Sequence, residues 1–288
     1  MKPSQTPLIE VQGLFHTYLS GTKLSVDSLR NIDLKVFPGE RVGIIGPAGS
    51  GKSTLLQHLN GLLRPQRGDV RVKGVSILHS GEEIRTVRTR VGLLFQNPEN
   101  QLFEQFSGDD VAFGPRNMGL SSEEVRRRVK DAMEMAGLPF SFKDRLTAQL
   151  SLGEKRRLAL AGVLAMEPEV LVLDEPTASL DPGGRRRLLR ILSGWTSAGT
   201  KAMVFASHKM EDIVETSDRV YVLLRGRIAL AGTTRQVFSR VDFLLKNGLA
   251  VPVAAELIHN LMGRGHSVSG EVLTDSEAAQ EVRGLYHA

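Results

Sequence analysis

The 288-residue sequence contains no cysteine, which excludes disulfides, thiol catalysis and metal sites built on sulfur. It also lacks a long hydrophobic run: the longest, at residues 158–166, is about half of the roughly 18–20 residues that a membrane helix needs. The first residues, Met-Lys-Pro-Ser-Gln-Thr-Pro, lack the apolar stretch of a signal peptide. We therefore expect a soluble, cytosolic chain that needs another protein to hold it at a membrane.

Charge of one sign is not strongly in excess. The 37 basic and 32 acidic residues give a net charge of +5, which permits an acidic partner or nucleic acid but favours neither. Three short basic runs, at 126–128, 155–157 and 185–187, are interpreted as solvated helix faces. With 41% hydrophobic residues the chain can bury a substantial core, as one large domain or as a domain with an appendage.

A glycine-rich segment after a buried strand is the strongest functional signal. Residues 42–45 form an apolar run, and residues 46–53 match G-x-x-x-x-G-K-[ST], the phosphate-binding P-loop. Glycines let the main chain wrap a phosphate, Lys52 can reach the β- and γ-phosphates, and the Ser53 hydroxyl can hold Mg²⁺. A chance glycine-rich turn is the alternative, which the strand–loop–helix context disfavours. The predicted nucleotide-binding residues are Gly46, Pro47, Ala48, Gly49, Ser50, Gly51, Lys52, Ser53 and Thr54.

Two adjacent carboxylates end a second buried strand, at residues 170–173. Acids leaving a core strand are costly unless a cation or catalysis retains them. We expect Asp174 to hold Mg²⁺ through water and Glu175 to face an attacking water, which completes a nucleotide-hydrolysis site. His208 follows a third strand, at 201–206. A lone histidine is more often structural, but this one is predicted at the sheet edge where ligands collect, which favours a catalytic role.

Tyr18 and Gln96 are weaker candidates. Tyr18 lies in a predicted antiparallel β region (residues 8–37), where it could stack on an adenine ring or be an ordinary strand residue. Gln96 follows the predicted strand 91–95 and could reach a metal or a water. Most glutamines in that position merely satisfy a loop.

Beyond these segments, the pattern is helical from about 97 to 166, and the composition changes after residue 240. We expect a nucleotide-binding domain at 1–240, containing a helical subdomain at 97–166, and a small C-terminal extension at 241–288 that contacts other subunits. The extension is predicted to hold one amphipathic helix at 253–262 and a weakly structured tail, except near 278–286.

The order of these motifs resembles that of an ABC-type ATPase over residues 8–240. This resemblance implies an α/β fold of the P-loop NTPase class, with a mixed β-sheet core, an antiparallel β subdomain, a helical signature subdomain and a small C-terminal extension. It further implies that Tyr18 stacks on adenine, that Gln96 lies near Mg²⁺ and the attacking water, that Glu175 is the general base, and that His208 holds the γ-phosphate. Ser179 and Asp181 match the D-loop of the family.

The family signature, usually Leu-Ser-Gly-Gly-Gln, reads Leu-Ser-Leu-Gly-Glu at residues 150–154. Leu152 and Glu154 depart from it, whereas Ser151 and Gly153 are kept. The resemblance implies that Ser151, Gly153 and Glu154 contact the ATP of a partner subunit. A P-loop and its own signature lie on opposite sides of the domain in this family, so a dimer would sandwich the ATP.

A narrower resemblance is carried by the segments at 58–63, 95–103, 111–117 and 161–169. They are similar to the ATP-binding subunits of energy-coupling factor transporters, which resemble cobalt and nickel importer ATPases and carry a short C-terminal extension. The expected function is Mg²⁺-dependent ATP hydrolysis that energises import of vitamins or transition-metal ions. The expected partners are a second ATPase subunit, a transmembrane coupling subunit that contacts residues 96–113, and a substrate-binding membrane subunit. The chain would act as a peripheral subunit at the cytoplasmic face of the cell membrane.

Two other readings remain. A soluble ABC ATPase acting on nucleic acid or ribosomes usually carries two nucleotide domains or a long coiled-coil insertion; neither is present, so no nucleic-acid partner is expected. A nucleotide-gated module that does not hydrolyse ATP is disfavoured by Glu175 and His208. The transported substrate, and the choice between a homodimer and a heterodimer, stay open.

Overall fold

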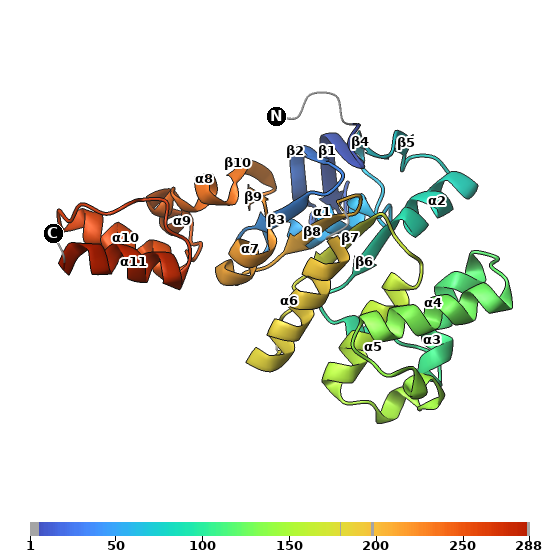
Figure 1. Ribbon diagram of the computed structural model, residues 1–288. Helices are drawn as coiled ribbons and strands as arrows, with labels where there is room; N and C mark the ends of the chain where they lie inside the picture. The colour runs from blue at the N-terminus through green and yellow to red at the C-terminus, as the bar shows by residue number, and fades with distance from the viewer. Residues whose placement is uncertain (1–5, 179, 197–198, 287–288) are drawn as a thin grey trace.

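The computed structural model describes residues 6–178, 180–196 and 199–286. Two β-sheets organise this part of the chain (Figure 1). The smaller sheet is antiparallel, in the order β2(Val26–Val36), β1(Ile9–Tyr18), β4(Arg67–Val72) and β5(Val75–Ser76). The larger, six-stranded sheet has the order β10(Arg227–Thr233), β9(Arg219–Leu224), β3(Arg41–Ile45), β8(Ala202–Ala206), β7(Val170–Asp174) and β6(Val91–Leu94).

The six-stranded sheet is parallel except for its edge strand β10, which pairs with β9 as an antiparallel hairpin. Its central strands are apolar and buried on both faces, as parallel strands covered by helices must be. Together with the antiparallel sheet, it confirms the predicted α/β class with a mixed core and an antiparallel β subdomain.

Helices and short 3₁₀ turns fill the connections. The helices are α1(Lys52–Leu59), α2(Glu82–Arg90), α3(Ser107–Asn117), α4(Ser122–Met135), α5(Leu152–Leu164), α6(Pro182–Thr196), α7(Met210–Thr216), α8(Thr234–Phe238), α9(Val241–Lys246), α10(Val253–Gly263) and α11(Asp275–Tyr286). The 3₁₀ turns span Pro98–Gln101, Phe140–Asp144 and Thr147–Gln149. Within the described ranges, no helix is both long and apolar enough to cross a membrane.

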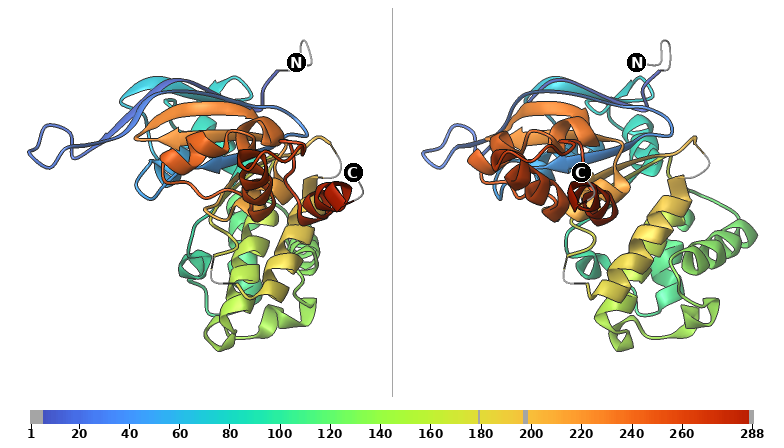
Figure 2. Two further views of the ribbon diagram at one scale, coloured as in Figure 1. Left: turned by 90° about the vertical axis from the view of Figure 1, so that its left-hand side faces the viewer. Right: turned by 60° about the vertical axis from the view of Figure 1, so that its left-hand side comes forward.

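Two hydrophobic clusters lie on opposite faces of the six-stranded sheet. One joins this sheet to the antiparallel sheet and encloses α1, whose Leu55, Leu56 and Leu59 are fully buried. The other joins the opposite face to α6, α7 and the helices α3–α5, which form a separate lobe in Figures 1 and 2. Alternate residues of each strand serve the two clusters, so the sheet fixes α1 on one side and the helical lobe on the other.

The C-terminal extension holds the predicted helix at 253–262 as α10, and α11 covers the ordered stretch expected near 278–286. Its helices α10 and α11 pack on each other around Ala254, Ile258, Val272 and Ala278 and project away from the sheets (Figure 1). In contrast, α9 belongs to the large core through Val241 and Leu244. Side-chain packing of the main domain therefore continues past residue 240.

Candidate nucleotide-binding and hydrolysis site

The register of the parallel strands brings the predicted site residues to one edge of the sheet. Leu94 of β6 lies opposite Leu173 of β7, and Asp174 lies opposite Ala206 of β8, which in turn lies opposite Ile44 of β3. The segments that begin at Gly46, Gln96, Asp174 and Ser207 therefore leave four neighbouring strands at similar heights. This is the carboxyl edge, where ligands of open α/β sheets bind.

The P-loop requires glycine at specific places. A Cβ on Gly46 would lie 2.3 Å from the Leu223 carbonyl oxygen and 2.5 Å from Ser50 Oγ. Gly51 has a φ of 104° and precedes α1 with no side-chain cap, so the first N–H groups of this helix carry no capping side chain. Such free N–H groups at a helix start, within a glycine-rich turn, suit a phosphate.

Lys52 lies over this loop. Its Nζ donates to the carbonyl oxygens of Gly46 at 2.7 Å and Pro47 at 3.2 Å. Burial lowers the pKa of Lys52, whereas the charges of Glu175 and Asp174 act to raise it. The ammonium group is thus held between the P-loop and the acid pair, where a triphosphate would meet it.

Asp174 and Ser53 offer oxygen ligands of the kind that Mg²⁺ takes. The Asp174 carboxylate is buried, and burial raises its pKa; Glu175 adds to this rise, while a hydrogen bond from Ser53 and the Lys52 charge oppose it. A hydroxyl and a desolvated carboxylate fit a Mg²⁺ ion that keeps waters and phosphate oxygens as its other ligands. In the part of the chain that the structure describes, no group of three or more His, Asp or Glu could hold a metal ion alone.

Glu175 and His208 are in direct contact. Glu175 Oε2 lies 2.7 Å from His208 Nδ1 and accepts the His208 backbone N–H at 3.2 Å. Glu175 has a φ of 50°, a left-handed conformation that is strained for a residue other than glycine and clusters at functional sites. Its backbone N–H donates to Ala206 O at 2.9 Å. The pair therefore places a carboxylate and an imidazole beside Asp174, with the carboxylate buried and the ring exposed.

Tyr18 and Gln96 lie at the margins of this region. The Tyr18 hydroxyl is 3.2 Å from Thr54 Oγ1, which also accepts from Ser28 Oγ at 2.8 Å. Tyr18 is 41% exposed, so one side of it is open beside α1, as a stacking platform would require. Gln96 is exposed directly after β6. Both roles stay predictions.

The signature segment lies in the helical lobe, away from α1 (Figures 1 and 2). Ser151 caps α5 in a capping box with Glu154. Glu154 Oε2 accepts from Ser151 Oγ at 2.7 Å and from Ser151 N at 2.8 Å. The hydrogen bonds from Ser151, with the charges of Arg145 and Arg157, lower the pKa of Glu154. Glu154 thus caps the helix as the usual glutamine can, but with a negative charge.

Of the predicted D-loop residues, Ser179 lies outside the described residues. Asp181 Oδ1 accepts the Gly184 N–H at 3.1 Å, so it caps the start of α6. The capping role agrees with the position of Asp181 just before Pro182.

The interpretation of the basic runs as solvated faces was wrong for at least one member of each run. Arg128 binds Glu124 and Glu167, Arg156 is 8% exposed and binds Glu99, and Arg185 binds the fully buried Asp212. Three consecutive helical residues span about 200° of the helix surface, so a member of such a run can lie against the buried face. No motif in the sequence pointed to Asp212, which also accepts from the Thr177 hydroxyl, two residues after Glu175.

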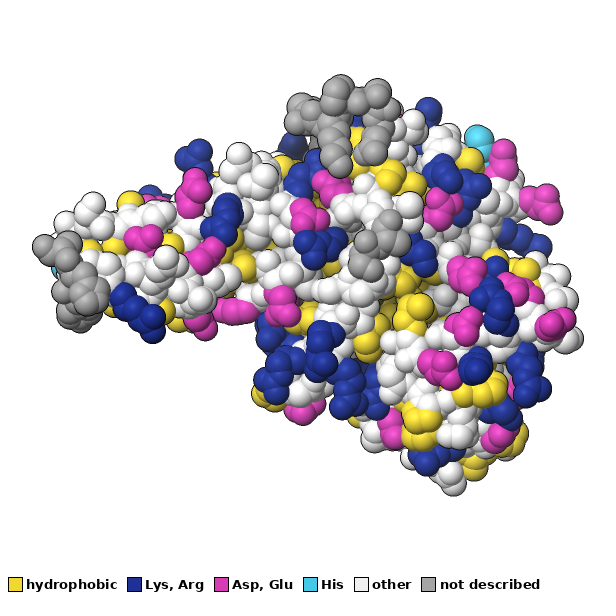
Figure 3. Space-filling view, in the orientation of Figure 1, with side chains coloured by type: hydrophobic (Ala, Val, Ile, Leu, Met, Phe, Trp, Pro, Cys, Tyr) yellow, Lys and Arg dark blue, Asp and Glu magenta, His cyan; other side chains and the backbone are white. Residues whose placement is uncertain are grey.

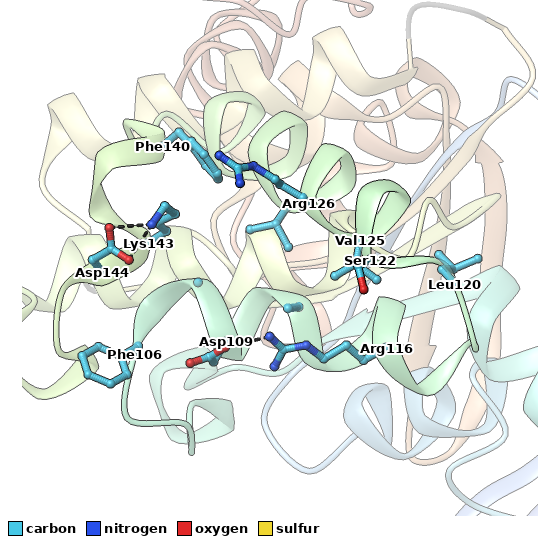
Figure 4. A pocket seen from close by; sticks show the side chains of 13 residues that line it. Phe106, Asp109, Arg116, Leu120, Ser122, Val125, Arg126, Phe140, Lys143 and Asp144 are labelled. Carbon is cyan, nitrogen blue, oxygen red and sulfur yellow. Dashed lines mark hydrogen bonds and ion pairs between the residues drawn. The ribbon is translucent and has the colours of Figure 1, made fainter.

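A separate hollow of about 510 Å³ lies in the helical lobe between α3, α4 and the turn Phe140–Asp144 (Figure 4). An ion pair between Arg116 and Asp109, 2.9 Å long, crosses its wall. All of its lining residues fall between Phe106 and Asp144. The hollow is therefore not part of the sheet-edge site.

Comparison with known proteins agrees with this geometry. The model of the family "ABC transporter" matches residues 29–178. The energy-coupling factor transporter ATP-binding protein EcfA2 of Symbiobacterium thermophilum is 49% identical over 277 residues, which cover 96% of each chain. EcfA2 of Clostridium acetobutylicum is 44% identical and covers 95% of this chain and 96% of that one.

Solved structures give the same picture. CbiO1 from Clostridium perfringens, part of the ABC transporter complex cbiONQ, has a TM-score of 0.73 and 36% identity, and the match covers 90% of this chain and all of that one. The ATP-binding cassette MJ0796, solved as a post-hydrolysis dimer with ADP and Pi, has a TM-score of 0.71 and 27% identity, with 79% and 99% covered.

Proposed function

This chain belongs to the ABC transporter ATPase family, and from that premise we propose that it is the ATP-binding and hydrolysing subunit of an energy-coupling factor importer of vitamins or transition-metal ions. The observation that carries the ATPase function is the meeting of the P-loop, Asp174 and the Glu175–His208 pair at one sheet edge. The near full-length identity to EcfA2 proteins supports the transporter type.

In the proposed site, the P-loop N–H groups and Lys52 hold the β- and γ-phosphates. Ser53 and Asp174 would hold Mg²⁺, with Gln96 nearby, and the bound ion would supply positive charge at the phosphate oxygens. Glu175 accepts the proton of the attacking water, because its carboxylate is fixed by two contacts with His208. His208 keeps its ring exposed and contacts the γ-phosphate. Most of the acceleration comes from positioning and charge, as in other phosphoryl transfers.

A second ATPase subunit, either another copy or a related chain, completes the site in this proposal. Support comes from the position of Ser151, Gly153 and Glu154 at the start of α5, in a different lobe from α1 (Figure 1). The dimeric state of MJ0796 is consistent with such an arrangement. The extension at 241–288 adds to this contact: Val253 and Leu257 lie one turn apart on α10 and are exposed.

A transmembrane coupling subunit docks beside Gln96 in this proposal. Phe103, which is 63% exposed, meets Phe113 edge-on with ring centroids 4.7 Å apart. These rings border a groove of about 330 Å³ that also includes Leu62 and Phe95. Exposed aromatic residues at a groove are typical of interfaces. This contact, and a substrate-binding membrane subunit, would make the chain a peripheral subunit at the cytoplasmic membrane face.

Nothing favours action on nucleic acid. Basic side chains gather near the start of α6, which carries Arg185, Arg186 and Arg187, but elsewhere they are interspersed with acidic ones (Figure 3). Mixed charge of this kind lacks the continuous basic stripe of a nucleic-acid interface.

The test is affinity purification of the tagged chain from cells that also express its candidate partner subunits. We expect a second ATPase and membrane subunits to co-purify, with Mg²⁺-dependent phosphate release by the assembled complex. Lys52→Ala should abolish nucleotide binding. Full activity of the isolated monomer at high dilution, or nucleotide binding unaffected by Lys52→Ala, would overturn the proposal.

A further inference from the structure

A buried arginine near the start of α5 ties three separate segments together. Arg156 Nε lies 3.1 Å from Glu99 Oε2, and its second terminal nitrogen lies 3.4 Å from Glu99 Oε1. Its other terminal nitrogen donates to the carbonyl oxygen of Ala178. Glu99 belongs to the 3₁₀ turn Pro98–Gln101, just after Gln96, whereas Ala178 lies three residues after Glu175.

The Ala178 carbonyl belongs to the turn that carries Glu175. The Ala178 N–H donates to Glu175 O at 3.0 Å and closes this turn. On another side of the turn, the Thr177 hydroxyl donates to buried Asp212, which also binds Arg185. Because Glu175 holds a left-handed conformation, these contacts with neighbouring segments help to keep it there.

The Arg156–Glu99 pair is shielded from water, since both side chains are largely buried. Burial alone would raise the pKa of Glu99, but the Arg156 hydrogen bond and charge keep it below its usual range. Two parallel hydrogen bonds give the pair a defined orientation as well as energy. Displacement of Glu99 must therefore move Arg156 or break a buried ion pair, which is costly.

We propose that Arg156 is a positioning residue that couples the Pro98–Gln101 turn to the turn carrying Glu175. A membrane subunit that shifts residues 98–101 would thereby change how the Glu175 carboxylate is held. That last step rests on the proposed function, whereas the coupling itself rests only on the contacts of Arg156.

The coupling is tested first in the isolated full-length chain, by hydrogen exchange of the Ala178 amide. Arg156→Gln and Glu99→Gln should each speed this exchange about three- to tenfold, although Glu99 does not contact Ala178. The double variant should exchange no faster than Arg156→Gln, because both changes break one linkage. The matched control is Glu124→Gln, an equivalent change on α4 at an ion pair with Arg127 and Arg128; it should leave Ala178 at the wild-type rate.

An arginine that served only local stability would give a different result. Ala178 exchange would then respond to Arg156→Gln but not to Glu99→Gln, or the two effects would add in the double variant. Either outcome overturns the proposal.

A second measurement addresses the assembled transporter. The ratio of ATP turnover in the complex to that in the ATPase pair alone should fall about tenfold in Arg156→Gln and Glu99→Gln and be retained in Glu124→Gln, since couplings between sites are typically about 5–150-fold. An unchanged ratio in both variants would overturn the last step, in which a shift of residues 98–101 by the membrane subunit changes how the Glu175 carboxylate is held. Should the wild-type chain assemble with no membrane subunit, the proposed function fails instead, and the Ala178 exchange still decides the role of Arg156.

Discussion

Replacing Gly46 by alanine tests whether the P-loop is as tightly confined as the structure indicates. The new Cβ would lie 2.3 Å from the Leu223 carbonyl oxygen, about 1.1 Å closer than ordinary contact at 3.4 Å. It would also lie 2.5 Å from Ser50 Oγ. The serine side chain can rotate, but Leu223 O is main chain of β9, so the loop or the strand must shift.

Overpacking of this kind costs about 1–3 kcal/mol, and a shift approaching 1 Å at a phosphate site costs up to about 100-fold in function. For a chain of 288 residues we expect Gly46→Ala to lower the melting temperature by about 2–5 °C. Thermal unfolding by circular dichroism and titration with a fluorescent ATP analogue measure both effects, with ATP affinity falling at least about tenfold.

Gly49→Ala is the matched control for stability. It lies in the same loop, has a φ of 73°, and its new Cβ would meet no atom within 4 Å. Only the left-handed backbone is then strained, at about 1 kcal/mol. Gly46→Ala should therefore be the more destabilised variant, and Ser50→Ala added to it should recover only part of the loss. A Gly46→Ala protein as stable as Gly49→Ala that binds ATP normally would refute the steric argument.

Three further results are expected. Glu175→Gln should reduce phosphate release by the assembled complex at least about 100-fold, because the base is lost and the fold is kept. An ATP-bound dimer should then accumulate and be detected by gel filtration. Turnover at the normal rate would exclude Glu175 as the base. His58 is fully buried, and burial lowers its pKa from 6.5 to about 4, so its contribution to stability is complete above pH 6.5 and is lost as the pH falls from 6.5 through 4. His58→Leu should therefore make the free energy of unfolding less sensitive to acid over that range, by up to roughly 3 kcal/mol. An unchanged pH profile would contradict this. Burial raises the pKa of Asp174, so the ionised Asp174 carboxylate destabilises the fold at neutral pH, and this cost is absent below pH 3.8. Asp174→Asn should raise the melting temperature at pH 7 without Mg²⁺ or nucleotide, lose that gain below pH 3.8, and abolish Mg²⁺-dependent hydrolysis. A lower melting temperature at pH 7 would show that Asp174 stabilises the fold.

The sequence predicted the fold class because the signals for the central strands are strong and local. Apolar runs at β3, β7 and β8 end in Gly46, Asp174 and Ser207, and the rule that parallel strands end at one edge joins them. This rule placed Glu175 and His208 at the same edge, whereas their direct contact comes from the structure alone.

The sequence could not reveal the contacts that depend on which way a helix faces. Arg156 and Arg157 are adjacent and chemically alike, yet only Arg156 pairs with Glu99, 57 residues earlier in the chain. Asp212 lies in the acidic first turn of α7, where acidic residues are usually exposed, yet it is fully buried. Its partners Thr177 and Arg185 come from segments distant in the sequence. Such pairings are set by tertiary packing, which periodicity does not encode.

The placement of α5 in a lobe apart from α1 has a consequence for the living cell. If a partner's signature segment completes the site, as we propose, a copy of this chain that is made in excess or released from a transporter would carry the P-loop without the segment that closes over the nucleotide. Such an unassembled chain would bind nucleotide without hydrolysing it, so ATP consumption would follow the number of assembled complexes and not the amount of this chain that is synthesised.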